Sequence, residues 1–245
     1  MKIAFQMDPI ELVDINADST FRLAEEAQIR GHDIYVYTPN NLTFNRGKIA
    51  AKVRSISLKR TIDDHVNFGT EEMLALNEFD VIWLRQDPPF DMGYITNTHL
   101  LDLVAQETLI VNNPFWVRNL PEKLLVLEFP DLIPDTLISR DLDEIKNFKK
   151  EFNDIIIKPL YGNGGAGIFR LREDDKNLTS LHELFCNMSS EPLIAQAFVP
   201  DVKNGDKRII LVDGEPVGAI NRVPKVGEIR SNMHVGWISI PRFCW

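Results

Sequence analysis

The chain has 245 residues, 44% hydrophobic and 26% charged, which is the composition of an ordinary globular protein. Its 36 acidic residues outnumber 27 basic ones, and the net charge of −9 argues against nucleic acid as the main partner. The apolar run at the amino terminus meets Asp8 and Glu11 too early for a signal peptide, and no run is long enough to span a membrane. Cys186 and Cys244 fit no metal or redox spacing, so we expect a cytoplasmic protein.

The first 120 residues alternate strand-like and helix-like patterns. Apolar runs that predict strands lie at 2–7, 33–37, 80–85 and 109–113. Helices are expected at 16–31 and near 94–106, and a two-stranded excursion over 42–58 turns at 45–47. This order predicts an α/β domain with a parallel sheet, whose ligands bind beyond the carboxyl ends of the strands.

The pattern changes near residue 121, where hairpin signals begin to dominate. Helices are expected at 121–129, 141–152 and 178–187. Strands are expected at 135–139, 154–160, 168–173, 193–199 and 207–223, the last with a hairpin turn at Asp213-Gly214. We therefore expect a second, α+β domain that begins near residue 121.

A glycine-rich loop lies within KPLYGNGGAGIFR (158–170), where Gly162, Gly164 and Gly167 form G-x-G-x-x-G. A dinucleotide-binding turn is followed by a helix, but the alternation after Ile168 predicts a strand. A Walker A loop is excluded because no Lys-Ser or Lys-Thr follows the last glycine. Two readings remain: a hairpin flap whose backbone amides hold phosphate, or a mobile turn without a ligand. Four glycines in six residues favour the flap.

Several cations could join this flap around an anionic ligand. Lys123 begins the second domain, Lys158 lies on the strand before the flap, and the strand around Gln196 offers a backbone edge to an adenine. Arginines follow at 208, 222 and 230. Each charge alone is more often a solvated surface group, but together they would surround one anionic cleft.

With these motifs, the sequence resembles the ATP-grasp ligases and, among them, the prokaryotic-type glutathione synthetases. The matching segments are MDPI (7–10), ADSTF (17–21), RQDPPFD (85–91), NNP (112–114), PEKL (121–124), IIKPLYGNGGAGIFR (156–170), AQAFVP (195–200), NGDKRIILVDGEPVGAINRVP (204–224) and GEIRSN (227–232). They follow the family's order over nearly all of residues 1–236. The resemblance implies an N-terminal α/β domain at 1–120, then an incomplete α+β ATP-grasp domain in two parts, 121–190 and 191–245.

The resemblance also implies an activity. ATP would phosphorylate the carboxylate of γ-glutamylcysteine, and the amine of glycine would attack the acyl phosphate to give glutathione, ADP and phosphate. The implied cofactors are ATP and Mg²⁺, with Mn²⁺ as an alternative metal, and the implied assembly is a homotetramer. Such chemistry needs positioning and charge stabilisation rather than a protein nucleophile.

Site residues follow from the resemblance by position. The nucleotide would be bound by Lys123, Lys158, Gly162, Asn163, Gly164, Gly165, Ala166, Gly167, Gln196, Ala197, Phe198, Val199 and Asp206. Arg208 and Arg222 would stabilise the transferring phosphoryl group, although Arg222 could also be a plain surface charge. Substrate contacts would come from Asp18, Ser19, Arg230 and Asn232. Asp18 and Ser19 are equally good candidates for helix caps.

The resemblance ends after residue 236. The family continues with a segment that carries its metal ligands, whereas WISIPRFCW (237–245) matches nothing in it. We therefore expect a truncated ATP-grasp domain that lacks these ligands, and slow phosphoryl transfer as a result. Three functions stay open: a glutathione-forming ligase, an inactive nucleotide-binding fragment, and another ATP-grasp carboxylate–amine ligase.

Overall fold

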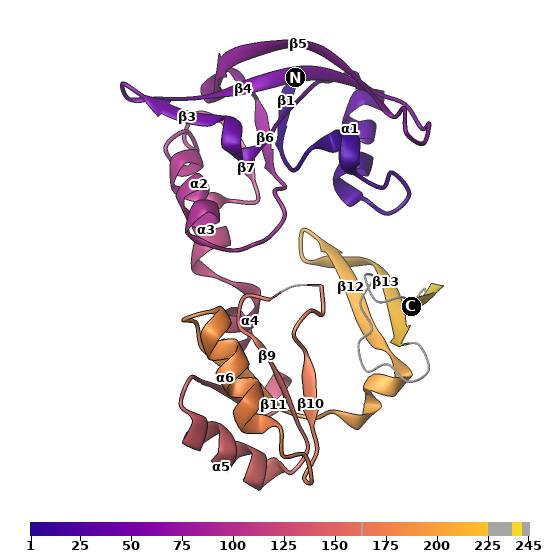
Figure 1. The fold of residues 1–245 in the computed structure, drawn as a ribbon. Coiled ribbons are helices and arrows are strands. Elements are labelled where there is room, and N and C mark those ends of the chain that lie inside the picture. Colours follow the sequence, from indigo (N-terminus) through magenta and orange to yellow (C-terminus); the bar gives the residue numbers. More distant parts are fainter. Residues whose placement is uncertain (163, 225–236, 242–245) are drawn as a thin grey trace. The chain divides into compact units, whose positions relative to one another are not determined.

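The computed structural model describes residues 1–162, 164–224 and 237–241 (Figure 1). The chain divides into two compact units, Met1–Pro121 and Glu122–Trp245. Each unit has its own sheets and its own hydrophobic core. Among the described helices, none is long and apolar enough to cross a membrane.

The first unit is built on a seven-stranded sheet in the order β3-β4-β2-β1-β6-β7, with β5 paired to β4. Its strands are β1 (Lys2–Gln6), β2 (Asp33–Tyr37), β3 (Leu42–Asn45), β4 (Lys48–Leu58), β5 (Val66–Ala75), β6 (Val81–Leu84) and β7 (Leu109–Val111). β1, β2, β6 and β7 pair in parallel, as the alternating pattern predicts. β3, β4 and β5 are antiparallel, so the sheet is mixed. β5 escaped prediction because most of its side chains are exposed, which removes the apolar alternation that marks a strand.

Helices and short 3-10 turns complete this unit. They are η1 (Ile10–Leu12), α1 (Ser19–Ile29), η2 (Pro39–Asn41), η3 (Leu76–Glu78), α2 (Met92–Asp102) and α3 (Pro114–Asn119). On one face of the sheet, Phe21, Ala24 and Ala27 of α1 pack against Phe5 of β1. The helix expected at 16–31 is thus confirmed, and its apolar side packs on the sheet.

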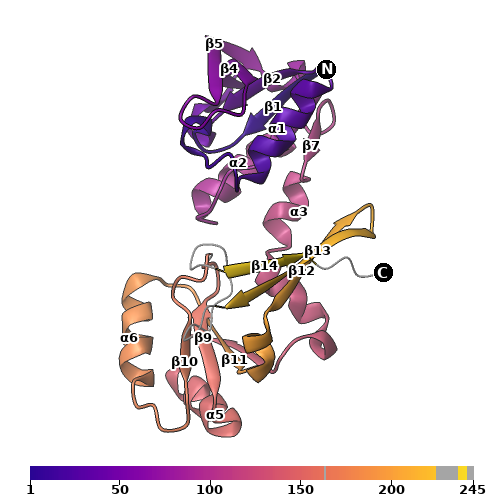
Figure 2. The ribbon, with the colours of Figure 1, turned by 90° about the vertical axis from the view of Figure 1, so that its right-hand side faces the viewer.

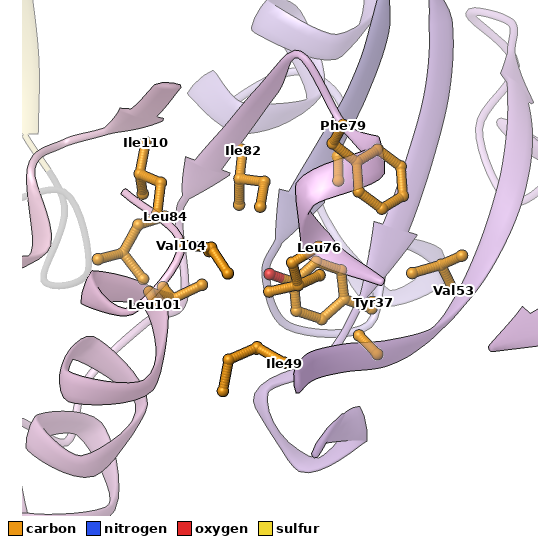
Figure 3. Packing of buried hydrophobic residues seen from close by; sticks show 12 residues of the cluster. Tyr37, Ile49, Val53, Leu76, Phe79, Ile82, Leu84, Leu101, Val104 and Ile110 are labelled. Atoms are coloured by element: carbon orange, nitrogen blue, oxygen red, sulfur yellow. The ribbon is translucent and has the colours of Figure 1, made fainter. Parts of the chain in front are cut away.

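The other face of the sheet packs against α2 and η3 (Figure 3). Leu76, Leu101 and Val104 meet Tyr37 and Ile82 in a core that is closed to solvent. α2 ends earlier than expected because residues 103–105 tighten into turns, in which the amides of Val104 and Ala105 bond the carbonyls three residues before them.

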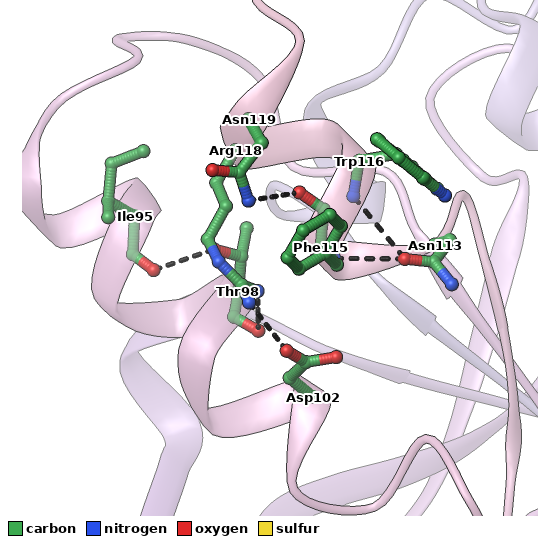
Figure 4. A network of polar contacts seen from close by, with 8 residues as sticks. All are labelled: Ile95, Thr98, Asp102, Asn113, Phe115, Trp116, Arg118 and Asn119. Carbon is green, nitrogen blue, oxygen red and sulfur yellow. Dashed lines mark hydrogen bonds and ion pairs between the residues drawn. The ribbon is translucent and has the colours of Figure 1, made fainter.

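A polar network joins α2 to α3, a helix that the sequence pattern did not predict (Figure 4). Asn113 caps α3, since its side-chain oxygen accepts from the amides of Phe115 and Trp116 at 3.0 and 3.3 Å. Arg118 Nη2 donates to Asp102 Oδ2 of α2 at 2.6 Å. The Arg118 side chain is only 10% exposed, so this is a largely buried ion pair that fixes one helix on the other.

The second unit contains a four-stranded antiparallel sheet in the order β10-β9-β11-β8 (Figure 2). Its elements are α4 (Glu122–Leu125), η4 (Val126–Glu128), η5 (Pro130–Leu132), β8 (Thr136–Ser139), α5 (Leu142–Phe152), β9 (Ile155–Pro159), β10 (Phe169–Leu171), α6 (Leu178–Met188) and β11 (Leu193–Ala197). Ile155 and Ile157 of β9 face α5 and α6 in a buried core. The expected helix at 121–129 is divided: α4 ends at Leu125, the 3-10 turn η4 continues to Glu128, and Phe129, which precedes Pro130, has a non-helical φ of −127°.

A second sheet of this unit is the hairpin β12 (Asp206–Val212) and β13 (Glu215–Pro224), extended by β14 (Trp237–Pro241) and preceded by η6 (Pro200–Asn204). Asp213 and Gly214 both have positive φ, of 51° and 82°, as a type I′ turn requires. The predicted hairpin turn is confirmed.

Candidate functional site

The glycine-rich loop joins two antiparallel strands, β9 and β10. The predicted strand after the loop is confirmed, which excludes the dinucleotide-binding turn. Gly164, Gly165 and Gly167 have φ values of 60°, 78° and 70°, in the left-handed region that favours glycine. The loop is therefore a hairpin flap whose shape depends on its glycines.

Two of the glycines let the flap fold back onto the end of β9. A Cβ atom at Gly162 would lie 3.2 Å from Pro159 Cβ, and one at Gly167 would lie 3.0 Å from Pro159 Cγ. Both approaches are tighter than side chains normally accept. Gly162 and Gly167 thus serve the packing of the flap.

Lys123, from α4, reaches the base of this flap. Its Nζ donates to the carbonyl of Pro159 at 3.2 Å and also to the carbonyl of Gly162. Burial lowers the pKa of Lys123, and the neighbouring Glu122 carboxylate opposes this shift. A partly desolvated ammonium is thereby held where the flap begins.

Lys158, on β9, is the second cation of the site. Its Nζ donates to Gln196 Oε1 at 2.7 Å. Burial lowers the pKa of Lys158, and the positive charge of Lys123 lowers it further. Two ammonium groups that repel each other in a half-buried site favour an anion between them.

A pocket of about 190 Å³ opens between these lysines and the flap. Six of the predicted nucleotide residues line it: Lys123, Lys158, Gly162, Gly164, Gly165 and Ala166. Sites for drug-sized ligands measure roughly 300–1,000 Å³, so this pocket suits the phosphate end of a nucleotide rather than all of it.

The residues predicted to face the adenine lie on β11 and directly after it. The amides of Ala197 and Phe198 donate to the carbonyls of Asp135 and Asp154, both at 2.9 Å. These two amides are therefore engaged within the unit rather than offered to a base. Val199 is 47% exposed just beyond the strand.

Arg170 stabilises this end of the sheet, and the sequence pattern did not identify it. Arg170 of β10 forms a bidentate ion pair with Asp154, at 2.9 Å from Nε and 2.5 Å from Nη2. Its guanidinium also lies 3.5 Å from the centre of the Phe198 ring. The bond from Arg170 holds the pKa of Asp154 below its usual value. The alternation of charged and apolar residues on a strand does not show that Arg170 pairs with Asp154, so the sequence alone could not have identified this ion pair.

Arg208, Arg222 and Asp206 share one face of the hairpin β12–β13. Asp206 is paired directly with Arg222, and Arg208 lies two residues further along β12. Arg222 Nε donates to Asp206 Oδ1 at 2.9 Å, and its side chain is 14% exposed. Arg222 is therefore a fixed, largely buried guanidinium rather than a plain surface charge. Arg208 is exposed.

In the first unit, Asp18 is the cap of α1, since its Oδ1 accepts from the amide of Phe21 at 2.6 Å. The hydroxyls of Ser19 and Thr20 accept from Arg85, at 3.0 and 2.9 Å. Arg85 follows β6 at the carboxyl edge of the sheet, where the fold places ligands. The predicted residues Asn163, Arg230 and Asn232 lie outside the described residues.

Metal ligands were the part of the site that the sequence pattern did not provide. Within residues 1–162, 164–224 and 237–241, no group of three or more His, Cys, Asp or Glu side chains could hold a metal ion. Asp206 is instead occupied by Arg222, and Asp213 lies in the hairpin turn.

Comparison with known families settles the lineage. The sequence model of the N-terminal domain of prokaryotic glutathione synthetase matches residues 1–118, and that of its ATP-grasp domain matches residues 122–239. The chain belongs to the prokaryotic glutathione synthetase family. The match to the family's ATP-grasp domain thus extends past residue 236, where the motif resemblance ends.

Individual relatives support this membership. The chain is 56% identical to the glutathione synthetase of Brucella melitensis over 236 residues, which cover 96% of this chain and 76% of the relative. It is 41% identical to that of Vibrio parahaemolyticus, with 96% of this chain and 75% of the relative covered. The chain therefore spans about three quarters of the length of these relatives.

Solved structures share the fold at low sequence identity. A D-cycloserine synthetase aligns with a TM-score of 0.66 at 14% identity, covering 98% of this chain and 75% of its own. An ATP-grasp RimK-domain protein from Sphaerobacter thermophilus gives 0.62 at 16% identity, covering 91% and 73%. An α/β N-terminal domain followed by an ATP-grasp domain is thus confirmed as the fold class.

Proposed function

We propose that this chain acts as an ATP-dependent ligase that joins γ-glutamylcysteine to glycine. The terminal carboxylate of γ-glutamylcysteine attacks the γ-phosphorus of ATP, which forms an acyl phosphate and releases ADP. The amine of glycine then attacks the acyl carbon and expels phosphate, so that the new amide bond completes glutathione. The energy of one phosphoanhydride bond thus drives one amide bond.

The observation that carries this proposal is the pair of lysines at the flap. Lys123 and Lys158 line one pocket with four residues of the flap, and burial lowers the pKa of both ammonium groups. Positive charge in a partly desolvated site stabilises the phosphate oxygens of ATP and the charge that develops during transfer. The flap covers the same phosphates and limits the access of water.

The hairpin arginines have the second role. Arg222, oriented by Asp206, and Arg208 on the same face stabilise the transferring phosphoryl group and the acyl phosphate. Asp206 acts through Arg222 rather than on the nucleotide itself. Asp18 and Ser19 hold the amino end of α1 and the guanidinium of Arg85, and we assign the substrate side of the reaction to this group.

None of these residue roles involves a metal ion. The family implies Mg²⁺, and no step here is assigned to the metal; within the described residues, no group of three or more His, Cys, Asp or Glu side chains could hold one. The division of the ATP-grasp part into 121–190 and 191–245, the homotetramer and the cytoplasmic location also stay predictions.

A coupled assay of ADP release tests the activity. Purified chain with ATP, Mg²⁺, γ-glutamylcysteine and glycine should release ADP only when both amino-acid substrates are present, and glutathione should appear in equal amount. Binding of ATP without turnover would overturn the ligase and leave the nucleotide-binding fragment. Turnover with a different pair of amino acids would identify another carboxylate–amine ligase of the same fold.

A further inference from the structure

A chain of hydrogen bonds crosses three strands behind the lysine pocket. Lys158 Nζ on β9 donates to Gln196 Oε1 on β11 at 2.7 Å, and Gln196 Nε2 donates to Thr136 Oγ1 on β8 at 2.8 Å. Thr136 Oγ1 in turn donates to the carbonyl of Pro134 at 2.7 Å. Thr136 and Gln196 are directly paired in the sheet, so all three side chains lie on one face.

The end of this chain determines its direction. The carbonyl of Pro134 can only accept, so the single hydroxyl proton of Thr136 is committed to it. Thr136 Oγ1 can then only accept from Gln196, which turns the amide nitrogen of Gln196 toward Thr136 and its oxygen toward Lys158. An amide oxygen favours the protonated form of a lysine, whereas an amide nitrogen in the same place would oppose it.

We propose that Thr136 is a positioning residue for nucleotide binding: through the amide of Gln196 it holds Lys158 as an ammonium aimed at the pocket. This inference rests on the proposed function for the identity of the ligand, but the hydrogen-bond chain itself does not. The half-buried position of all three side chains makes the arrangement matter, because water competes poorly for these groups.

Other charges around Lys158 act in the opposite sense or are already paired. Lys123 approaches from α4 and disfavours the ammonium of Lys158, while Glu122 lies beside Lys123. Arg170 on the neighbouring strand β10 is paired with Asp154. Among the described hydrogen bonds of Lys158, the one to Gln196 is therefore the contact that supports its charge.

Two variants of the full chain separate positioning from packing. Thr136→Val keeps the shape but removes the hydroxyl, and Thr136→Ser keeps the hydroxyl but removes a methyl group. We expect Thr136→Val to weaken ATP binding about tenfold and Thr136→Ser to stay within about twofold, measured by titration calorimetry. Combining Thr136→Val with Gln196→Leu should weaken binding no further than Gln196→Leu alone, because both act through one amide.

A second readout needs no nucleotide. The rate at which Lys158 reacts with an amine-labelling reagent, followed by mass spectrometry across pH, gives the midpoint of its deprotonation. Thr136→Val should move this midpoint to lower pH, and Thr136→Ser should leave it in place. Equal midpoints in the wild type and Thr136→Val, with both folded, would overturn the positioning role. Failure of the wild type to bind ATP, with the midpoint shifted, would instead overturn the nucleotide as the ligand, and with it the proposed ligase, while the control of Lys158 by Thr136 would stand.

Discussion

At the scale of single residues, the charge of Lys158 sets a pH limit on nucleotide binding. Because burial and Lys123 lower its pKa, Lys158 loses its proton at a pH below the ordinary lysine value of 10.5. The ammonium form binds phosphate, so ATP affinity should be full at neutral pH and fall as the pH rises through this lowered pKa. Calorimetric titration between pH 7 and 10 measures the decline.

The control for this prediction is Lys158→Met, which keeps the length of the side chain without its charge. It should bind ATP roughly 10–100-fold more weakly at pH 7, as expected for loss of charge-assisted hydrogen bonds. It should also show a shallower decline at alkaline pH. A wild-type affinity that declines no more steeply than that of Lys158→Met as the pH rises toward 10.5 would contradict the assigned role.

Tyr37 carries a buried hydroxyl group that makes no hydrogen bond among the described residues. Its hydroxyl is buried without a hydrogen-bond partner in the described structure, and burial raises its pKa. An unsatisfied buried hydroxyl costs about 1–3 kcal/mol, so Tyr37→Phe should raise the free energy of unfolding by about 1 kcal/mol or more. Urea denaturation, followed through the unfolding transition of the first unit, measures this change in stability. Tyr35→Phe, at a partly buried site, is the control. A loss of stability would show that the hydroxyl is satisfied.

At the scale of elements, Gly167 is a flap residue at which both the backbone conformation and the neighbouring atoms require glycine. Gly167 combines a φ of 70° with a contact of only 3.0 Å to Pro159 for an added Cβ atom. Gly167→Ala should therefore distort the flap and weaken ATP binding about tenfold or more, since misplacement of a few tenths of an ångström affects every phosphate contact.

The hairpin turn offers a matched control for this substitution. Gly214 has a similar φ of 82°, but an added Cβ atom would meet nothing within 4 Å. Gly214→Ala should cost about 1 kcal/mol of stability from backbone strain and leave ATP affinity unchanged. If both variants bound ATP equally well, the flap would have no special requirement at Gly167.

The joint between α2 and α3 depends on Arg118. This side chain is 10% exposed and pairs with Asp102, so Arg118→Met should lower the free energy of unfolding of the first unit by about 2–3 kcal/mol. Arg30→Met tests a pair of the same chemistry on the surface, where Arg30 is 69% exposed, and should cost less than about 0.5 kcal/mol. Equal losses of unfolding free energy in the two variants would mean that burial does not strengthen the Arg118–Asp102 pair.

The elements that could be predicted from sequence are those with a strong local signal. β9, α5 and the hairpin turn were expected from an apolar run, a charged helical segment at 141–152 and an Asp-Gly pair. β5 and α3 were missed because exposed strands and short helices carry little periodicity. The helix expected at 121–129 is instead a turn of α-helix followed by a 3-10 turn, and a local apolar pattern does not distinguish these two geometries.

At the scale of the whole molecule, sequence motifs indicated the residues of the candidate site but not the hydrogen bonds that orient them. The flap and Lys158 lie together in the sequence, and Lys123 could be added because it matches a family position. The bonds that orient them come from residues such as Thr136 and Asp154, which are distant in the sequence and ordinary in type. Hydrogen-bond partners across a sheet depend on register, and one sequence does not specify register at this precision.

The last prediction concerns how a nucleotide acts on the two units. Every described residue that lines the lysine pocket belongs to the second unit, and the first unit has a core of its own. A ligand that binds only the folded state stabilises what it binds, by about 2.7 kcal/mol at a concentration 100 times its dissociation constant. ATP should therefore slow hydrogen exchange in β9, β10 and β11 by up to about 100-fold.

Amides of β1, β2 and β6 should exchange at the same rate with and without ATP, as measured by mass spectrometry of peptic fragments. Lys158→Met is the control, because at the same ATP concentration its weaker binding should reduce the protection to roughly 2–10-fold while leaving the exchange of the first unit unchanged. Protection that appeared in the first unit with ATP alone would mean that the nucleotide also stabilises this unit. In that case the lysine pocket would be only part of the nucleotide site, and residues such as Arg85 would have to be tested for a share in it.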